Sequence, residues 1–319
     1  MAASPPSVTV LGAGIIGLTI ALTLSERGHA VRIVAREIED GTASAAAASL
    51  WSAPLVERTE RARRWAYLTL ARLRVDALDE ATGIQDRLAL AVGAVAGAPD
   101  PWMRGFAPPL RAAEPEELPR GAAAGTLSVI PLIDTATYLP WLRARCASAG
   151  VAIEHGEVTA LRDVAGPGET VVVAAGAGSS ALTRDEGLRP VRGQVVLLSN
   201  PGLTRTLVVR DGEFGPLFVV PRGADVVVGG PAQDRLWDPR PDPAFESDLL
   251  ARARVVEPRM EDATVLGRAV GHRPVRETVR LEREDMGGAR IVHCYGHGGA
   301  GITLSWGCAA DVAELVGAP

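Results

Sequence analysis

The chain of 319 residues contains no lysine, so all 33 side chains counted as Lys or Arg are arginines. Reactions that need a lysine amine are therefore excluded, among them Schiff-base catalysis, pyridoxal-phosphate chemistry and phosphate transfer at a Walker A loop. Acidic residues number 38, and the formal net charge of -5 provides no basic surface for nucleic acid. We therefore expect no nucleic-acid partner.

Cysteine is scarce as well, and Cys146, Cys294 and Cys308 lie far apart along the chain. An odd number of cysteines at these spacings is typical neither of a disulfide framework nor of a metal cluster, and indicates a reducing compartment. His293 and His297 also lack a recognisable ligand spacing and are interpreted as structural. We therefore predict no metal site.

Long apolar runs are missing too. The longest, residues 8–24, is interrupted by three glycines and has no basic segment before it. This pattern predicts a strand, a turn and a helix, and argues against a signal peptide. Because no uninterrupted apolar stretch of about 20 residues occurs, we expect no membrane span and predict a soluble, cytoplasmic protein.

The residues that are present, 47% apolar and 22% charged, are those of a globular chain of about two domains. A strand at 8–11, a turn at 12–17, a helix at 18–27 and a strand at 30–35 predict a βαβ unit. Residues 43–49 are all small and predict a loop that lies close to something bulky. From residue 194 onward, short strands separated by turns predict an antiparallel region. Further helices are expected at 57–82, 135–150, 244–255 and 302–315, and strands at 151–153, 157–161, 170–174, 194–198, 206–209, 217–220, 225–228 and 290–294.

The first motif with a chemical meaning is Gly12-x-Gly14-x-x-Gly17. The first two glycines allow a tight turn and the approach of a pyrophosphate, and the third lets helix and strand pack closely. The phosphate would then lie at the positive N-terminus of the helix. With a strand, a helix and a second strand in place, the motif predicts a dinucleotide site that includes Ile15 and Ile16. A helix turn that is merely closely packed is the alternative.

The residue expected about 20 positions after the third glycine, where a carboxylate binds a ribose hydroxyl, is Glu37. Its neighbour Arg36 leaves the cofactor open, because an arginine there can accept the 2′-phosphate of NADP or lie over the adenine and ribose of FAD. The alternative is that both charges only solvate the end of a strand.

A second glycine turn, residues 296–301, leads from an apolar strand into the last predicted helix. A nicotinamide enzyme does not need such a second turn, whereas FAD lies extended and its reduced ring carries negative charge. The dipole of a helix that starts near Ile302 would stabilise that charge by about 0.3 to 2 kcal/mol. Thr303 can add a hydroxyl donor, so the two turns together favour FAD.

Two arginines lie shortly before this second turn. Pro274 stiffens the backbone after Arg273, and an arginine on a stiff segment can hold a carboxylate through two parallel hydrogen bonds. The alternative for Arg273 is a solvated side chain or an internal ion pair with Glu277 or Glu282, and only the resemblance described below argues against it. For Arg276 we expect solvation or an ion pair with Glu277 or Glu282.

Together these motifs resemble the D-amino-acid oxidase family of FAD-dependent flavoenzymes, including its members similar to glycine oxidase. The resemblance covers nearly the whole chain, and the match at its C-terminal signature is highly specific. The matching segments are residues 8–17 (FAD fingerprint), 49–51 (loop under the flavin), 193–195 (a strand of the substrate domain), 271–276 (substrate arginine) and 291–309 (C-terminal signature).

The resemblance implies an α/β fold in which a Rossmann-like FAD-binding domain is interleaved with an α+β substrate domain built on an antiparallel sheet. It places residues 1–50, 134–190 and 265–319 in the FAD-binding domain. Residues 51–133 and 191–264 would form the substrate domain.

The resemblance also implies roles for individual residues. Arg273 would bind the substrate carboxylate, and the carbonyl of Gly299 would accept a hydrogen bond from the substrate amine. No side chain acts as a general base: a hydride leaves the α-carbon for flavin N5, the imine hydrolyses, and O2 reoxidises the flavin to give peroxide. Beyond the first glycine turn, FAD contacts are expected from Arg36, Glu37, Ser44, Ser49, Leu50, Trp51, Val158, Ala177, Gly298, Gly299, Gly301, Ile302 and Thr303.

One departure from the family concerns Phe214 and Phe218, which occupy positions where the family usually has tyrosines. At Phe218 a hydroxyl donor to the substrate carboxylate is lost, and a hydrogen bond to a charged group contributes about 1.5 to 3 kcal/mol. The leading hypothesis is oxidation of neutral or apolar D-amino acids by O2. Alternatives are an oxidase of glycine, sarcosine or a biosynthetic amine, an NADP-dependent dehydrogenase, and a noncatalytic flavin-binding protein. A homodimer is left open.

Overall fold

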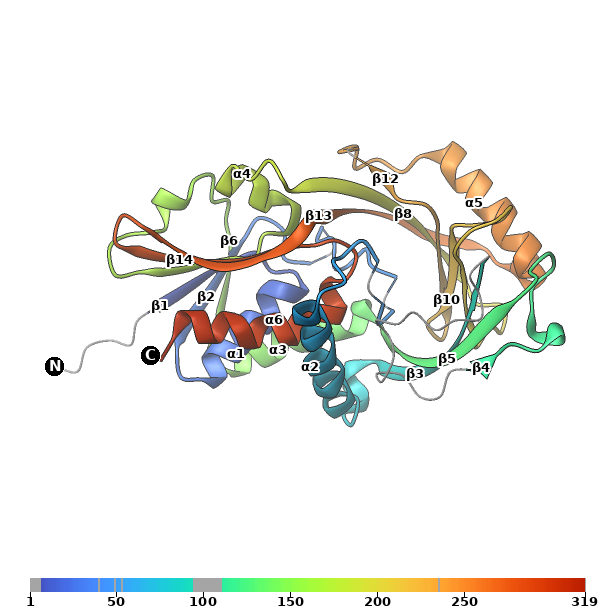
Figure 1. The fold of residues 1–319 in the computed structure, drawn as a ribbon, viewed down its shortest axis with the longest axis horizontal. Helices are drawn as coiled ribbons and strands as arrows, with labels where there is room; N and C mark the ends of the chain where they lie inside the picture. Colours follow the sequence, from blue (N-terminus) through green and yellow to red (C-terminus); the bar gives the residue numbers. More distant parts are fainter. Residues whose placement is uncertain are drawn as a thin grey trace.

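The computed structural model describes residues 7–39, 41–48, 50–52, 54–93, 111–234 and 236–318. These residues build one 14-stranded sheet that runs along the long axis of the molecule (Figure 1). Its strand order is β4-β5-β3-β9-β10-β11-β8-β13-β14-β7-β1-β2-β6, and β12 pairs with β8 beside this path. The strands run parallel at one end of the sheet and mostly antiparallel at the other.

One end of the sheet is parallel throughout, in the order β6-β2-β1-β7-β14. All four residues of β7 are buried, as expected for a central parallel strand that is covered on both faces. The predicted βαβ unit is confirmed here. The strands are β1 (Ser7–Leu11), β2 (Ala30–Ala35), β6 (Ala152–His155), β7 (Thr170–Val173) and β14 (Ala289–His297).

Four long helices lie on one side of this parallel end, and the short α4 (Ser179–Thr183) lies on the other (Figure 1). The helices α2 and α6 cross so closely that a Cβ at Gly307 would stand 2.7 Å from the carbonyl carbon of Trp65. The helix predicted at 57–82 is shorter than expected, because Thr59 caps its start and the chain turns away after Asp76. The four helices are α1 (Ile15–Glu26), α2 (Glu60–Asp76), α3 (Thr135–Ser148) and α6 (Gly301–Val316).

The other end of the sheet is antiparallel except where β3 and β9 run side by side in parallel. The helix α5 (Pro243–Val256) covers it, and a second hydrophobic core fills the space beneath. The antiparallel region predicted after residue 194 is confirmed. Its strands are β3 (Ile84–Val92), β4 (Arg111–Ala112), β5 (Gly125–Ile133), β8 (Arg189–Ser199), β9 (Thr206–Val209), β10 (Leu217–Pro221), β11 (Asp225–Gly229) and β12 (Gln233–Asp234).

A single strand of 22 residues, β13 (Val265–Met286), joins the two ends. Its residues up to Val275 pair with β8. Val275 and the residues from Arg280 onward pair with β14, with a register shift between Val275 and Arg280. In Figure 1 it extends from the parallel end into the antiparallel end. The residues near its middle are therefore close to both parts of the fold.

Several sequence predictions need correction. The strand predicted at 157–161 is wrong, because that segment is irregular and leads into a short 3-10 turn, Leu161–Asp163. The strands β3, β5 and β13 were not predicted. Among the described residues, no helix is both long and apolar enough to cross a membrane.

Candidate active site

The predicted cofactor residues gather at one edge of the parallel strands. In open α/β sheets ligands bind outside the carboxyl ends of the strands, and each group of predicted residues follows such an end. The fold thus brings together segments that are far apart in the sequence. Residues 12–17 follow β1, Arg36 and Glu37 follow β2, Val158 follows β6, Ala177 follows β7 and residues 298–303 follow β14.

The first glycine turn has the geometry that its sequence predicts. Gly12 has a φ of +110°, and a Cβ there would stand 2.5 Å from the carbonyl oxygen of Ala174 on the next strand. A Cβ at Gly17 would overlap the carbonyl of Gly12. Gly14, the N-cap of α1, has no side chain to offer the helix start. The amide of Ile15 donates to the hydroxyl of Ser44, and the other amides of the first turn are directed to where an anion would bind.

The loop of small residues lies between this turn and β13. The hydroxyl of Ser44 accepts a hydrogen bond of 3.0 Å from the amide of Ile15. On its other side, a Cβ at Gly271 would stand 3.1 Å from the Cβ of Ala46. The loop therefore lies against the backbone on two sides, and its predicted contact with a bulky group stays a prediction. Ser49, also predicted to contact the cofactor, lies outside the described residues.

At the end of β2, both charged candidates have protein partners. The side chain of Arg36 is 66% exposed and lies 3.5 Å from Glu157 and 3.8 Å from Glu37. Glu37 in turn folds over Gly41, where a Cβ would stand 2.8 Å from the carboxyl carbon. Both side chains therefore lie at the predicted edge, and their contact with a ribose or adenine stays a prediction.

The segment after the small-residue loop is fastened to two elements. The amide of Trp51, whose side chain is buried, donates to Pro131 of β5 over 3.0 Å, and Leu50 forms a bridge with Leu132. The hydroxyl of Thr303 accepts from the amide of Ser52 over 3.0 Å and donates to its carbonyl. The hydroxyl that the sequence offers to the cofactor is thus already used by the protein backbone.

The second glycine turn is confirmed as a strand, turn and helix. Gly298 has a φ of +55°, and a Cβ there would stand 2.8 Å from the carbonyl carbon of Leu55. Its amide donates to Pro274 over 2.8 Å, and the amide of Gly299 donates to Pro54 over 3.0 Å. The helix α6 then begins without a side-chain cap, so a second open helix N-terminus lies at this edge.

Arg273 lies on β13 with its guanidinium flat against Gly193 of β8. A Cβ at Gly193 would stand 2.6 Å from the guanidinium carbon. The side chain donates one long hydrogen bond of 3.5 Å to the carbonyl of Arg192, and within the described residues no carboxylate pairs with it. Burial lowers the pKa of Arg273. A partly buried cation without a counter-charge is costly, which is the arrangement expected of a site for an anion.

Neighbouring arginines are used differently. Arg276 donates to Asp185 over 3.0 Å, so the predicted ion pair is present but its partner is neither Glu277 nor Glu282. Arg192 is almost fully buried and donates to the carbonyl of Asp238 over 2.8 Å. Of these three arginines, Arg273 has the fewest hydrogen-bond partners among the described residues.

The residues predicted to recognise the two ends of a substrate adjoin each other. A Cβ at Gly299 would stand 3.4 Å from Cδ of Arg273. Phe218 lies on the same face of the sheet as Arg273, because it is in register with Gly229, which pairs with Val195 of β8. The fold therefore places Gly299, Arg273 and Phe218, the residues predicted to contact the substrate, on the same side of the sheet.

Phe214 is not part of this group. Its ring lies 3.3 Å from a Cβ built at Gly121, and it packs against the core that α5 covers. Phe218 instead packs beside Leu50 on the opposite face. The sequence pattern treats the two phenylalanines alike, and only the tertiary structure separates them.

A parallel sheet with two glycine turns is joined by one long strand to an antiparallel sheet, and that strand carries the partly buried Arg273. This arrangement defines a two-part oxidoreductase that binds a dinucleotide. The chain belongs to the family described as FAD dependent oxidoreductase, whose model matches residues 7–315. FAD is thus its cofactor, and the resemblance inferred from the sequence is confirmed. The glycine turns and open helix N-termini fit that group.

Named relatives agree with this assignment. The chain is 39% identical over 310 residues to a D-amino-acid oxidase of Rubrobacter xylanophilus, with 97% of this chain and 95% of that protein covered. It is 38% identical over 311 residues to a D-amino-acid oxidase of Streptomyces coelicolor, at 97% and 96% coverage. A glycine oxidase from Geobacillus kaustophilus has the same fold, with a TM-score of 0.82 at 23% identity and coverage of 98% and 95%.

Proposed function

We propose that this chain is a D-amino-acid oxidase that converts its substrate and O2 into an imino acid and peroxide, the imino acid then hydrolysing to a 2-oxo acid and ammonia. The observation that carries the proposal is the partly buried guanidinium of Arg273, which lacks a carboxylate partner among the described residues and adjoins Gly299. Support also comes from two relatives at 38% and 39% identity that bear this name.

In this proposal the edge of the parallel sheet holds the cofactor. The first glycine turn and the start of α1 bind the pyrophosphate, and Ser44 keeps the small-residue loop against that turn through its bond to Ile15. Bound FAD supplies the two-electron acceptor that O2 regenerates. The start of α6 stabilises negative charge near residues 298–303 through its open amides.

The substrate is held at two points. Arg273 binds the carboxylate with its planar fork, and the carbonyl of Gly299 accepts from the amine. When the carboxylate and the amine are both fixed, the α-hydrogen and the side chain exchange places between the two enantiomers. Only one enantiomer therefore directs its α-hydrogen toward the cofactor edge. Catalysis then depends on positioning and electrostatics, which is consistent with a chain that has no lysine to act as a base.

A second candidate, an oxidase of glycine, sarcosine or another amine, is favoured by Phe218, which provides no hydroxyl beside the carboxylate site. Peroxide release separates the two candidates when D-alanine, L-alanine, glycine and sarcosine are compared at equal concentrations. We expect D-alanine to be oxidised and L-alanine not. Equal turnover of both enantiomers, or activity with glycine and sarcosine alone, would remove the leading proposal.

The role of Arg273 is tested by Arg273→Leu, with Arg268→Leu on the same strand as the control because Arg268 pairs with Glu246. Loss of a bidentate contact, about 1.5 to 3 kcal/mol per bond to a charged group, should raise KM for D-alanine by about a hundredfold or more. The yellow absorbance of FAD should be retained in both variants. An unchanged KM in Arg273→Leu would place the carboxylate elsewhere.

A further inference from the structure

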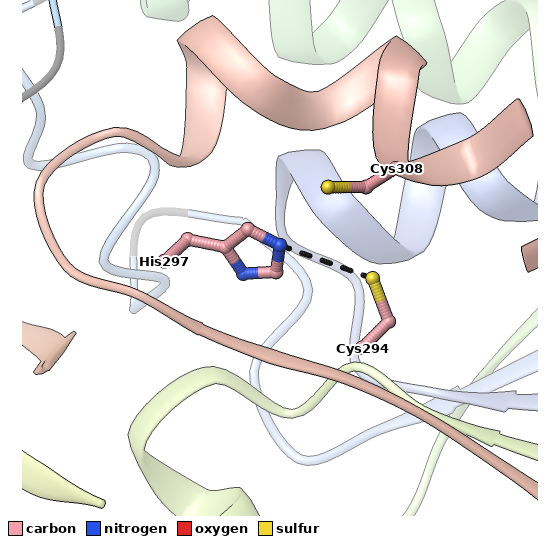
Figure 2. A group of neighbouring side chains, drawn as sticks. All are labelled: Cys294, His297 and Cys308. Carbon is pink, nitrogen blue, oxygen red and sulfur yellow. Dashed lines mark hydrogen bonds between the residues drawn. The ribbon is translucent and has the colours of Figure 1, made fainter. Parts of the chain in front are cut away.

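A group of three donor side chains lies behind the second glycine turn. Cys294 and His297 belong to β14 and Cys308 to α6, and the two sulfurs and one ring nitrogen all lie within 4.8 Å of one another (Figure 2). All three are buried, with 1%, 2% and 0% exposure. The conclusion from sequence spacing that the cysteines are too far apart to cluster is therefore wrong for Cys294 and Cys308. The third cysteine, Cys146, bonds instead to the carbonyl of Leu18.

The spacing of these donors suits a shared ion. Metal–sulfur bonds of about 2.3 Å and metal–nitrogen bonds of about 2.0 Å place donors around one ion roughly 3.5 to 4 Å apart. Sγ of Cys294 lies 3.8 Å from Nε2 of His297, and Figure 2 shows the ring nitrogen directed at that sulfur. Both cysteines are free thiols. The donors come from a strand and a helix, so their positions do not depend on a loop.

The charges around the cluster prepare it for a cation. Burial raises the pKa of Cys294, but the hydrogen bond from Cys308 and the ring of His297 outweigh burial and lower it to about 6. Burial, the bond to Cys294 and the charge of Asp311 keep the pKa of Cys308 well above its usual value, although the charge of Arg61 opposes them. An ion bound here would displace the thiol protons.

We propose that Cys294, His297 and Cys308 bind one thiophilic ion with a filled d shell, Zn²⁺ or Cu(I), through two thiolates and Nε2. Two thiolates with an imidazole are soft donors that select these ions over Mg²⁺ or Ca²⁺. The ion would tie β14 to α6 across the glycine turn at residues 298–301, and so brace the segment that leads into the open helix N-terminus. This site does not depend on which substrate the protein oxidises.

The test uses the FAD-loaded full chain, purified under anaerobic, reducing conditions and exposed separately to Zn²⁺ and to Cu(I) before excess ion is removed. We expect one equivalent of ion per chain in the natural protein and in the control Cys146→Ser. The ion should be lost from Cys294→Ser and from Cys308→Ser. X-ray absorption at the metal edge should report two sulfur ligands and one nitrogen ligand, and should distinguish the two ions.

Flavin absorbance and circular dichroism establish that each variant is folded, so a failed fold is not mistaken for a lost site. Affinity measured against a competing chelator should rise with pH, because the thiol ligands must lose their protons to bind an ion. The proposal would be overturned if the natural protein retained no ion, or if Cys294→Ser and Cys308→Ser retained as much ion as the natural protein. The three side chains would then form only a sulfur–imidazole hydrogen bond.

Discussion

The guanidinium of Arg273 rests on the bare backbone of Gly193, where a Cβ would stand 2.6 Å from its central carbon. The two residues belong to paired strands, β13 and β8, whose register places Gly271 opposite Gly193. The orientation of the proposed carboxylate-binding arginine is thus decided by a glycine that is 80 residues earlier in the chain.

Gly193→Ala should displace Arg273 while leaving the cofactor edge intact. Because the new methyl group would occupy the place of the guanidinium, we expect KM for D-alanine to rise by about tenfold, equivalent to about 1.4 kcal/mol of lost binding. Gly267→Ala on β13 is the control, since its Cβ would make only an ordinary contact of 3.9 Å with Leu197. Steady-state kinetics of both variants test this expectation. Equal KM values for Gly193→Ala and Gly267→Ala would show that Gly193 does not position the side chain of Arg273.

Phe218→Tyr should restore a missing hydrogen bond. The ring lies across Gly229 of β11, where a Cβ would overlap its para carbon, so the ring extends from β10 in the direction of β8 on the face that also carries Arg273. A hydroxyl there would gain the substrate carboxylate, and KM for D-alanine should fall by about tenfold for roughly 1.4 kcal/mol.

The matched control is Phe214→Tyr, which adds the same oxygen on the opposite face of the sheet and should leave KM unchanged. Should Phe218→Tyr bind D-alanine no better than the natural protein, the pocket is built for another substrate. The amine alternative would then be the better interpretation.

FAD should be bound without a covalent link. Cys146, Cys294 and Cys308 are each at most 1% exposed, so no cysteine thiol is presented at the surface. Acid precipitation should therefore release the yellow colour into the supernatant, as absorbance spectroscopy will show. Colour that stays with the pellet would demonstrate a covalent flavin.

Tyr138→Phe should destabilise the protein without touching the site. Its hydroxyl donates to the buried carboxylate of Asp76 over 2.7 Å and accepts from Trp306 over 3.1 Å. Loss of a bond to a buried charge should lower the free energy of unfolding by about 1.5 to 3 kcal/mol. Urea denaturation measures this change, with Tyr67→Phe as a control because Tyr67 is 58% exposed. A midpoint equal to that of the control would contradict the expected role.

The local elements were predictable because short-range patterns specify them. The first glycine turn, α1 and β2 follow from glycine spacing and continuous apolar runs, and the predicted family follows from the same segments. The strand β3 escaped prediction because its first residues are mostly polar and exposed. The strand β13 was not predicted because its last third contains four consecutive charged and exposed residues, 282–285, a pattern that resembles a loop.

The amino-acid sequence by itself determined the glycine turns, the parallel unit and the family, because each depends on residues that are neighbours in the chain. Only the tertiary structure decided that Arg273 lacks a carboxylate partner among the described residues, that Phe218 and Phe214 face opposite sides, and that Cys294, His297 and Cys308 meet. These relationships depend on strand register and on the packing of a helix against a strand. Such pairings are set by the burial of the whole sheet, so no short sequence window contains them.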